Sequence, residues 1–228
     1  LAGEVRRYTE SRSASFADWH PTERSILIST RFANTAQIHR VKQPGGARTQ
    51  LTFLDEPISG ATYEPRTGRY FLFTKDVGGN EFGQIYRYDV ADGRVTLLTD
   101  GGRSQNGGIE WSAQGDRIAY GSTRRNGADR DLYIMDPRQP KTDRMVAQMQ
   151  GGGWGVVDWS PDDARLLVRE SISVNESRLY LCEVDSGALR CITPGAVEKV
   201  AWGDAVFAKD GKALFVTTDK DSEFQRLG

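Results

Sequence analysis

The feature that most constrains the fold of this chain is a sequence unit that occurs five times. Each unit opens with an aromatic residue, turns through a short polar segment and enters an apolar run, as in WSPDDARLLV at 159–168. The second aromatic follows the first by 44 residues, and the next three intervals are 48 residues each. A near-constant period of this length indicates a solenoid, a propeller or another array. The opening aromatics are Trp19, Tyr63, Trp111, Trp159 and Phe207.

The rest of each unit predicts short strands. A polar loop follows the apolar run, then a segment such as QIYRYDV, a turn such as ADG or DSG, and a final segment such as RVTLLT. Runs of Val, Ile, Leu, Tyr and Thr between turn residues are typical of β-strands. The best helix candidate, KTDRMVAQMQ at 141–150, falls where the fourth strand is expected. We therefore expect an all-β chain; a β-helix fits less well, because its coils are usually shorter and lack such hairpin turns.

Four antiparallel strands repeated at this period describe a blade of a β-propeller. We expect one propeller region over 1–228, in which each opening aromatic ends the innermost strand and packs between blades. Four units are complete and the fifth stops early, so we expect a piece of a longer protein. The open strand edge would be covered by more of the same protein, by a second copy or by disorder. The repeats are expected near 15–58, 59–106, 107–154, 155–202 and 203–228, the last one truncated.

Composition excludes several classes of protein. The 228 residues carry 30 Lys and Arg against 31 Asp and Glu, so the basic excess of a nucleic-acid-binding protein is missing. No apolar run approaches the roughly 18 residues of a membrane span. The chain starts with Leu and without the apolar core of a signal peptide. We expect a trimmed or processed N-terminus and a soluble protein, with the cytoplasm favoured and the periplasm left open.

The two cysteines and two histidines predict neither a disulfide scaffold nor a zinc site, and we expect no cofactor. Cys182 and Cys191 flank the DSG turn. A two-residue loop would pair them directly, near disulfide distance. A three-residue loop with Gly in the left-handed region would shift the register by one and place them on opposite faces. The related turn VADGR favours the longer loop, so free thiols are predicted.

Three stretches, WSPDDARLLV, FAKDGKALFV and RLYLCEVDSGALRCIT, resemble the WD-like repeats of two groups. One group is the N-terminal propeller of prolyl-oligopeptidase-family serine peptidases, and the other is the periplasmic propeller protein of the Tol system. GGWGVVDWSPDD, STRRNGADRDLYIMDP and VTTDKDSEFQRL are more similar to the bacterial peptidases of the dipeptidyl and acylaminoacyl type. That resemblance implies a C-terminal α/β-hydrolase domain with a Ser-Asp-His triad in the same protein. It also implies a propeller that admits only short peptides.

The chain itself offers no catalytic residue. A hydrolase nucleophile sits in a G-x-S-x-G elbow, and GRSQNG at Gly102 comes nearest, with its second Gly one place late. We expect His20 to be a turn residue and His39 a strand residue. NGADRD lacks the calcium-loop pattern and is expected to be a solvated loop. The hydrolase domain is therefore expected outside these residues.

Charged and polar pairs on the loops between second and third strands are the candidate site. Arg124 and Arg125 stand together in one repeat, and Asn175 and Glu176 in the next. Function often lies on such loops, so these four are candidates for contact with a substrate or partner. The simpler interpretation is a solvated loop. Two functions remain open: a gating propeller of a serine peptidase, or a free-standing Tol-type module that binds proteins. A homo-oligomer is also left open.

Overall fold

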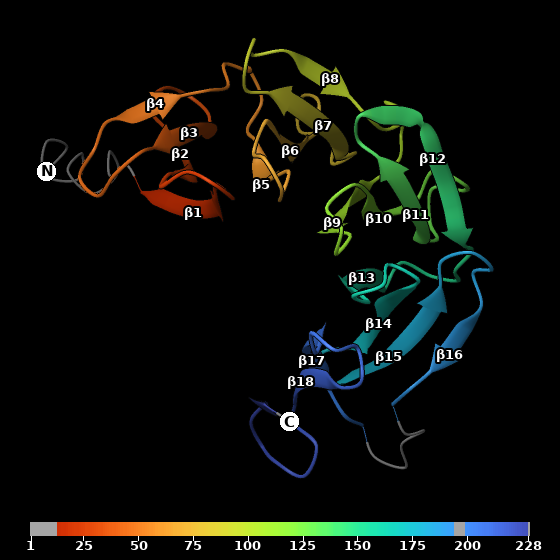
Figure 1. Cartoon of the computed structure of the whole chain (residues 1–228). Coiled ribbons are helices and arrows are strands. Elements are labelled where there is room, and N and C mark those ends of the chain that lie inside the picture. Colours follow the sequence, from red (N-terminus) through yellow and green to blue (C-terminus); the bar gives the residue numbers. More distant parts are fainter. Residues whose placement is uncertain (1–12, 194–198, 228) are drawn as a thin grey trace, which may run out of the picture. The chain divides into compact units, whose positions relative to one another are not determined.

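The computed structural model describes residues 13–193 and 199–227, and the statements below concern these residues. They contain strands and no helix, arranged in five antiparallel sheets (Figure 1). The all-β prediction is confirmed. The helix candidate at 141–150 lies mostly in a strand, as its place in the repeat required. A search of the same residues for a helix able to cross a membrane finds none.

The chain divides into two compact units, Leu1–Leu98 and Thr99–Gly228, which are described separately. The first unit holds two four-stranded sheets. The first sheet consists of β1 (Ala14–Trp19), β2 (Ile26–Thr30), β3 (Gln37–Val41) and β4 (Arg48–Gln50). The second sheet consists of β5 (Ser59–Tyr63), β6 (Tyr70–Lys75), β7 (Gln84–Asp89) and β8 (Val95–Leu97).

The second unit holds three sheets. The third sheet consists of β9 (Asn106–Trp111), β10 (Ile118–Ser122), β11 (Asp131–Asp136) and β12 (Gln139–Ala147). The fourth consists of β13 (Trp154–Trp159), β14 (Arg165–Ser173), β15 (Glu176–Glu183) and β16 (Leu189–Cys191). The fifth has three strands: β17 (Trp202–Phe207), β18 (Leu214–Thr218) and β19 (Arg226–Leu227). The sequence placed the truncation before a third strand, but Arg226 and Leu227 do form a short one.

Each opening aromatic is the last residue of the first strand of its sheet, as predicted. Trp159 is 3% exposed and packs in a core made by the third and fourth sheets. Phe207 packs against the fourth sheet, and Tyr63 lies in a core shared by the first and second sheets. Trp19 is 65% exposed, so the expected packing between sheets is wrong for it. Tyr63, Trp159 and Phe207 each pack on the preceding sheet of their own unit, and no sheet precedes β1 in the described residues.

The preceding sheet also places a side chain on the aromatic ring. Arg117 lies over the Trp159 ring at 5.4 Å, and Arg165 lies over the Phe207 ring at 5.9 Å. In the first unit the ring of His20 meets Tyr63 edge-on at 4.7 Å. A cation over an aromatic face is attracted by the ring quadrupole. This arrangement therefore links the first sheet to the second, the third to the fourth, and the fourth to the fifth.

Asp carboxylates form hydrogen bonds that link the first strands of neighbouring sheets. Asp158 Oδ2 accepts a hydrogen bond from Phe207 N at 2.6 Å, and Asp18 Oδ2 accepts one from Tyr63 N at 2.7 Å. Each Asp directly precedes the aromatic of its own strand. Bulges interrupt the first strands, for example between Phe16 and Asp18. A bulge redirects the side chains that follow it.

The two histidines occupy the expected places. His20 lies in the turn after β1, where its Nδ1 accepts hydrogen bonds from Thr22 N at 3.3 Å and Glu23 N at 3.0 Å. His39 is fully buried on β3, and burial lowers its pKa. Both residues therefore have structural roles in the first sheet.

The turn between β15 and β16 is longer than predicted. Cys182 pairs with Leu189, and Tyr180 pairs with Cys191. Glu183 N donates to Ala188 O at 2.9 Å, so four residues form the loop, with Gly187 at φ +70°. The two cysteines are free thiols, as predicted, but the predicted three-residue loop is wrong. Compared with a two-residue loop, which would pair Cys182 with Cys191, the register is shifted by two positions. The two cysteines therefore lie on one face of the sheet as diagonal neighbours and do not form a direct pair.

Candidate functional site

The loop that carries Arg124 and Arg125 joins β10 to β11 and is compactly folded. Gly127 N donates to Thr123 O at 2.7 Å. Asn126 Oδ1 accepts hydrogen bonds from Ala128 N at 3.1 Å and Asp129 N at 2.9 Å. An Asn side chain that bonds its own backbone in this way fixes a turn. The loop is therefore an ordered element that can position side chains.

Arg124 points back onto its own sheet. Its guanidinium lies over the Tyr133 ring at 3.7 Å and forms an ion pair with Asp143. Tyr120 Oη donates to the other carboxylate oxygen of Asp143 at 2.8 Å. Burial acts to lower the pKa of Arg124, but the hydrogen bonds, that to Asp143 above all, raise it above its ordinary value. The charge of Arg124 is thus neutralised within the sheet.

Arg125 ties the loop to the segment that leads into β13. Its Nε pairs with the fully buried Asp131 at 2.7 Å, and its Nη2 contacts Asp129 at 2.9 Å. Nη2 also donates to Met149 O at 3.0 Å. Asp129 accepts a hydrogen bond from Gly151 N at 2.6 Å, which is the largest cause of its lowered pKa. These contacts are intramolecular and saturate most of the guanidinium.

Asn175 and Glu176 lie at the tip of a hairpin rather than in an open loop. β14 and β15 pair up to Ser173 and Glu176. Asn175 Oδ1 accepts a hydrogen bond from Ser173 Oγ at 2.9 Å, and Glu176 lies 3.5 Å from Arg178. Val174, beside them, is fully exposed. Within the described residues, no hydrogen bond or ion pair joins this tip to Arg124 or Arg125.

Arg130 is a charged residue that the sequence analysis did not single out. Its Nη2 donates to Gly107 O at 2.8 Å, and its backbone N donates to Gly151 O at 2.9 Å. Burial lowers its pKa, and this is the only cause of the shift. Among the ion pairs of the described residues, none includes Arg130. Two features of the sequence point to Arg130: the segment NGADRD, which was interpreted as a solvated loop, and the pair Gly107-Gly108 near the start of β9.

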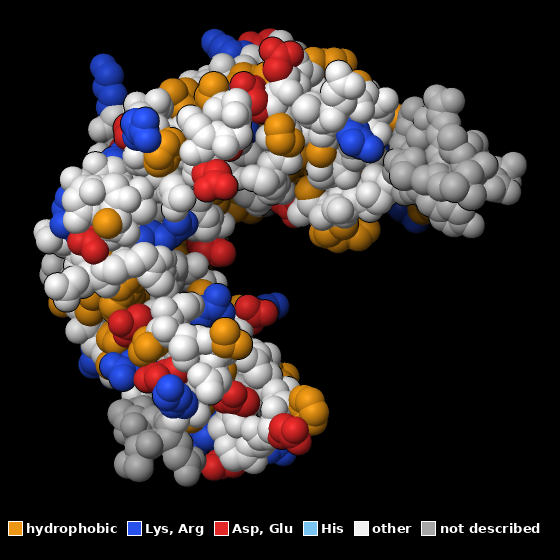
Figure 2. Space-filling model, turned by 180° about the vertical axis from the view of Figure 1, so that it is seen from behind, with side chains coloured by type: hydrophobic (Ala, Val, Ile, Leu, Met, Phe, Trp, Pro, Cys, Tyr) orange, Lys and Arg blue, Asp and Glu red, His pale blue; other side chains and the backbone are white. Residues whose placement is uncertain are grey.

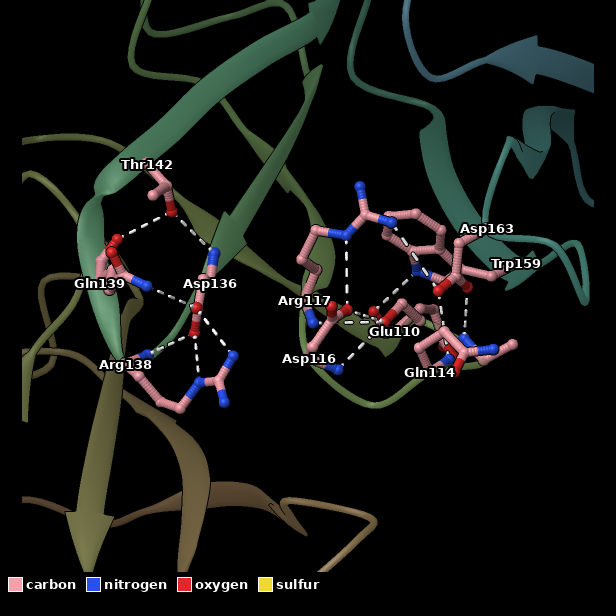
Figure 3. A network of polar contacts seen from close by, with 12 residues as sticks. Glu110, Gln114, Asp116, Arg117, Asp136, Arg138, Gln139, Thr142, Trp159 and Asp163 are labelled. Atoms are coloured by element: carbon pink, nitrogen blue, oxygen red, sulfur yellow. Dashed lines mark hydrogen bonds and ion pairs between the residues drawn. The ribbon is translucent and has the colours of Figure 1, made fainter.

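A separate polar network joins the third and fourth sheets (Figure 3). Asp163 Oδ1 accepts a hydrogen bond from Ala113 N at 2.6 Å, and Trp159 Nε1 donates to Glu110 O at 3.0 Å. Burial, followed by the charge of Asp158, raises the pKa of Glu110 to about 7. These contacts join turns and strand ends of two neighbouring sheets, so we assign the network to stability. The structure thus supports the expectation that the aromatic Trp159 serves packing.

Charged side chains of both signs lie on the described surface. On the face drawn in Figure 2, Lys and Arg side chains are interspersed with Asp and Glu side chains. No group of three or more His, Cys, Asp or Glu residues able to hold a metal ion occurs in the part of the chain that the structure describes. Phosphate contacts favour a collected basic patch, which this face lacks.

Comparison with known proteins identifies the fold. No family model and no curated protein matches the chain. A structure from a study of two prolyl endopeptidases matches 95% of the chain with a TM-score of 0.71 and 14% identity. TolB from Acinetobacter baumannii matches 93% with a TM-score of 0.61 and 17% identity. An oligogalacturonate lyase in complex with manganese matches 90% with a TM-score of 0.69 and 13% identity.

The chain spans only part of these proteins. It covers 34% of the prolyl endopeptidase chain, 53% of Acinetobacter TolB and 60% of the lyase. It covers 80% of a putative TolB from Agrobacterium tumefaciens, with a TM-score of 0.62 and 16% identity. Identities this low establish the fold and leave the activity open. The repeated antiparallel sheets and these neighbours together show that the chain has a β-propeller fold.

Proposed function

We propose that this chain is the non-catalytic propeller portion of a serine peptidase and that it restricts access to short peptides. The observation that carries the proposal is the match to the prolyl endopeptidase structure, which includes 95% of this chain but only 34% of the other. The sequence supports it, because the stretches that resemble peptidase propellers contain no nucleophile elbow. A C-terminal α/β-hydrolase domain of the same protein would supply the Ser-Asp-His triad.

In this proposal the 228 residues form one propeller region with the five repeats given above. The β10–β11 loop and the β14–β15 hairpin lie on the side of the propeller that faces the substrate. Asn175 is best suited to touch a peptide, because it is exposed at the hairpin tip, and the half-buried Glu176 lies beside it. Arg124 and Arg125 are held by carboxylates of their own sheet, so their contribution is to order the loop.

A second candidate function is a free-standing module that binds other proteins. The observation in its favour is the coverage of the putative Agrobacterium TolB, of which this chain spans 80%. An exposed hairpin tip with a fully exposed Val174 suits such a role, since apolar side chains at protein surfaces can serve as contact points. This candidate needs no hydrolase domain.

The deciding experiment compares the 228-residue chain with the full-length gene product. Both are treated with a fluorophosphonate probe and with chromogenic peptides of increasing length. We expect no labelling and no turnover for the chain, and both for the full-length protein. Removal of the propeller from the full-length protein should broaden the range of substrate sizes.

Each alternative outcome has a definite meaning. Stoichiometric labelling of a Ser within residues 1–228 would overturn the non-catalytic assignment. A full-length protein that is neither labelled nor active would overturn the peptidase proposal and favour the binding module. Unchanged size selection after removal of the propeller would refute the gating role alone.

A further inference from the structure

The segment around Arg130 is fixed at its backbone. Asp129 Oδ1 accepts a hydrogen bond from Gly151 N at 2.6 Å, and Asp131 Oδ1 accepts one from Met149 N at 2.8 Å. Between them, Arg130 N donates to Gly151 O at 2.9 Å. Residues 129–131 are therefore held against the segment 149–151, which leads to β13. The side chain of Arg130 starts from a rigid base.

Glycines leave the space that this side chain uses. A Cβ atom at Gly121 would lie 2.3 Å from Arg130 Nε, so only Gly permits the guanidinium to cross β10 there. A Cβ atom at Gly107 or Gly108 would lie 3.8 or 3.6 Å from Nη2. Gly108 is exposed and has a φ of +68°, at the point where the pairing of β9 with β10 is irregular. The guanidinium thus ends beside a stretch of backbone without side chains, open to solvent.

Within residues 13–193 and 199–227, no carboxylate forms an ion pair with Arg130. Arg124 and Arg125, six and five residues earlier, are paired with carboxylates, whereas the hydrogen bond of Arg130 goes to a backbone carbonyl. A guanidinium carries five N–H donors in a planar fork, and four of these donors remain after that bond. Partly burying a charge without a counter-ion is costly, and a carboxylate that approached the fork would remove that cost.

We propose that Arg130, together with the notch formed by Gly107 and Gly108, binds the carboxylate group of a ligand. The planar fork matches a carboxylate bidentately, and the two glycines allow it to approach the backbone closely. The chemistry could come from a peptide C-terminus, an acidic side chain or a small organic acid. The inference goes beyond both candidate functions and depends on neither of them.

The test follows the amide signals of Gly107 and Gly108 and the Nε–H signal of Arg130 by NMR. The chain is titrated at constant ionic strength with N-acetyl-alanyl-alanine, with its C-terminal amide, and with propionate. We expect saturable shifts with the two acids and none with the amide. A peptide that binds at least about tenfold more tightly than propionate would identify a peptide carboxylate as the preferred source.

Two substitutions and one matched control complete the experiment. Arg130→Met keeps the aliphatic stem and should weaken binding at least about tenfold, because a charge-assisted bond is lost. Gly107→Ala fills the notch without steric conflict, since its nearest neighbour would lie 3.8 Å away, and should also weaken binding. Gly155→Ala, at the corresponding position of β13 with nothing within 4 Å, should leave binding unchanged.

Several results would overturn the proposal. These are equal shifts with acid and amide, shifts that sodium chloride reproduces, or full binding by an Arg130→Met variant whose spectrum remains dispersed. The absence of saturable shifts up to about 50 mM ligand would also refute it. A dissociation constant above about 1 mM corresponds to less than about 4 kcal/mol of binding free energy, and binding much weaker than that does not mark a specific site.

Discussion

Replacement of Asp163 tests how the third and fourth sheets are held together. Asp163 lies in the turn between β13 and β14, is 5% exposed and has a φ of +57°. Its carboxylate accepts hydrogen bonds from Ala113 N at 2.6 Å and Gln114 N at 3.2 Å, across the sheet boundary. The corresponding positions in the third and fifth sheets are Gly115 and Gly211, both with positive φ. Asp therefore occupies a position suited to Gly, and its contacts must outweigh the strain.

The magnitudes give an order of stability for three variants. Hydrogen bonds to a charged group contribute about 1.5–3 kcal/mol each, and the lower end applies because Ala113 and Gln114 are exposed. The two bonds then contribute about 3 kcal/mol, and the left-handed backbone costs a non-Gly residue about 1 kcal/mol. Asp163→Gly loses the bonds and relieves the strain, for a net loss of about 2 kcal/mol. Asp163→Ala should lose about 3 kcal/mol, and Asp163→Asn about 1.5 kcal/mol, because Asn keeps one of the two acceptors.

The assay combines urea unfolding with amide hydrogen exchange. Urea unfolding gives the global free energy, and exchange at Ala113 and Gln114 reports the local boundary between the sheets. The exchange measurement matters because repeated sheets need not unfold in a single step. The reasoning is refuted if Asp163→Gly is as stable as the native chain, or if exchange at Ala113 is unchanged by the substitution.

Three further predictions concern buried groups and turns. Because burial raises the pKa of Glu110 to about 7, its stabilising contribution is complete below pH 4.5 and is lost as pH rises through 7. The free energy of unfolding should therefore fall by up to about 3 kcal/mol between pH 5 and pH 8, and urea titrations of Glu110→Gln should show a flatter dependence. Cys182 is buried and its pKa is raised to about 11, whereas Cys191 is exposed. A disulfide reagent should therefore react with one thiol in the native chain and with two in urea. Cys191→Ser should abolish the reaction of the native chain. Gly187→Ala should lower the free energy of unfolding by at least about 2 kcal/mol more than Gly93→Ala. Both glycines have φ near +70°, but only at Gly187 would the new Cβ lie 2.2 Å from a backbone oxygen. Equal melting temperatures of the two variants would contradict this.

The repeat pattern predicted the strands well because it reports local chemistry. The aromatic, the turn and the apolar run are adjacent in sequence, so their spacing placed the end of each first strand at the correct residue. Trp19 shows the limit of the pattern. It has the same local pattern as Trp159, an Asp before it and a Pro two residues after it, but is largely exposed, because burial of the aromatic depends on a neighbouring sheet.

The candidate site was harder to predict from the sequence, because its side chains meet partners on other strands. Arg124 and Arg130 lie six residues apart, yet one meets Asp143 on β12 and the other crosses Gly121 toward β9. Register and a strand irregularity fix these partners, and neither leaves a local signature. The four-residue loop after Glu183 was missed for a related reason, since Gly187 alone does not specify how many residues precede it.

The packing of Trp159 and Phe207 on the preceding sheets has a consequence for synthesis. Phe207 contacts the fourth sheet and Trp159 contacts the third, so each ring packs against strands that the ribosome has already produced. An emerging sheet thus finds its apolar partner in place and need not wait for later sequence. Most pairings also join strands that are adjacent in the chain, which keeps loop-closure costs low. Within each unit, a newly made sheet can therefore pack on the one made before it, and this limits the exposure of apolar surface during translation.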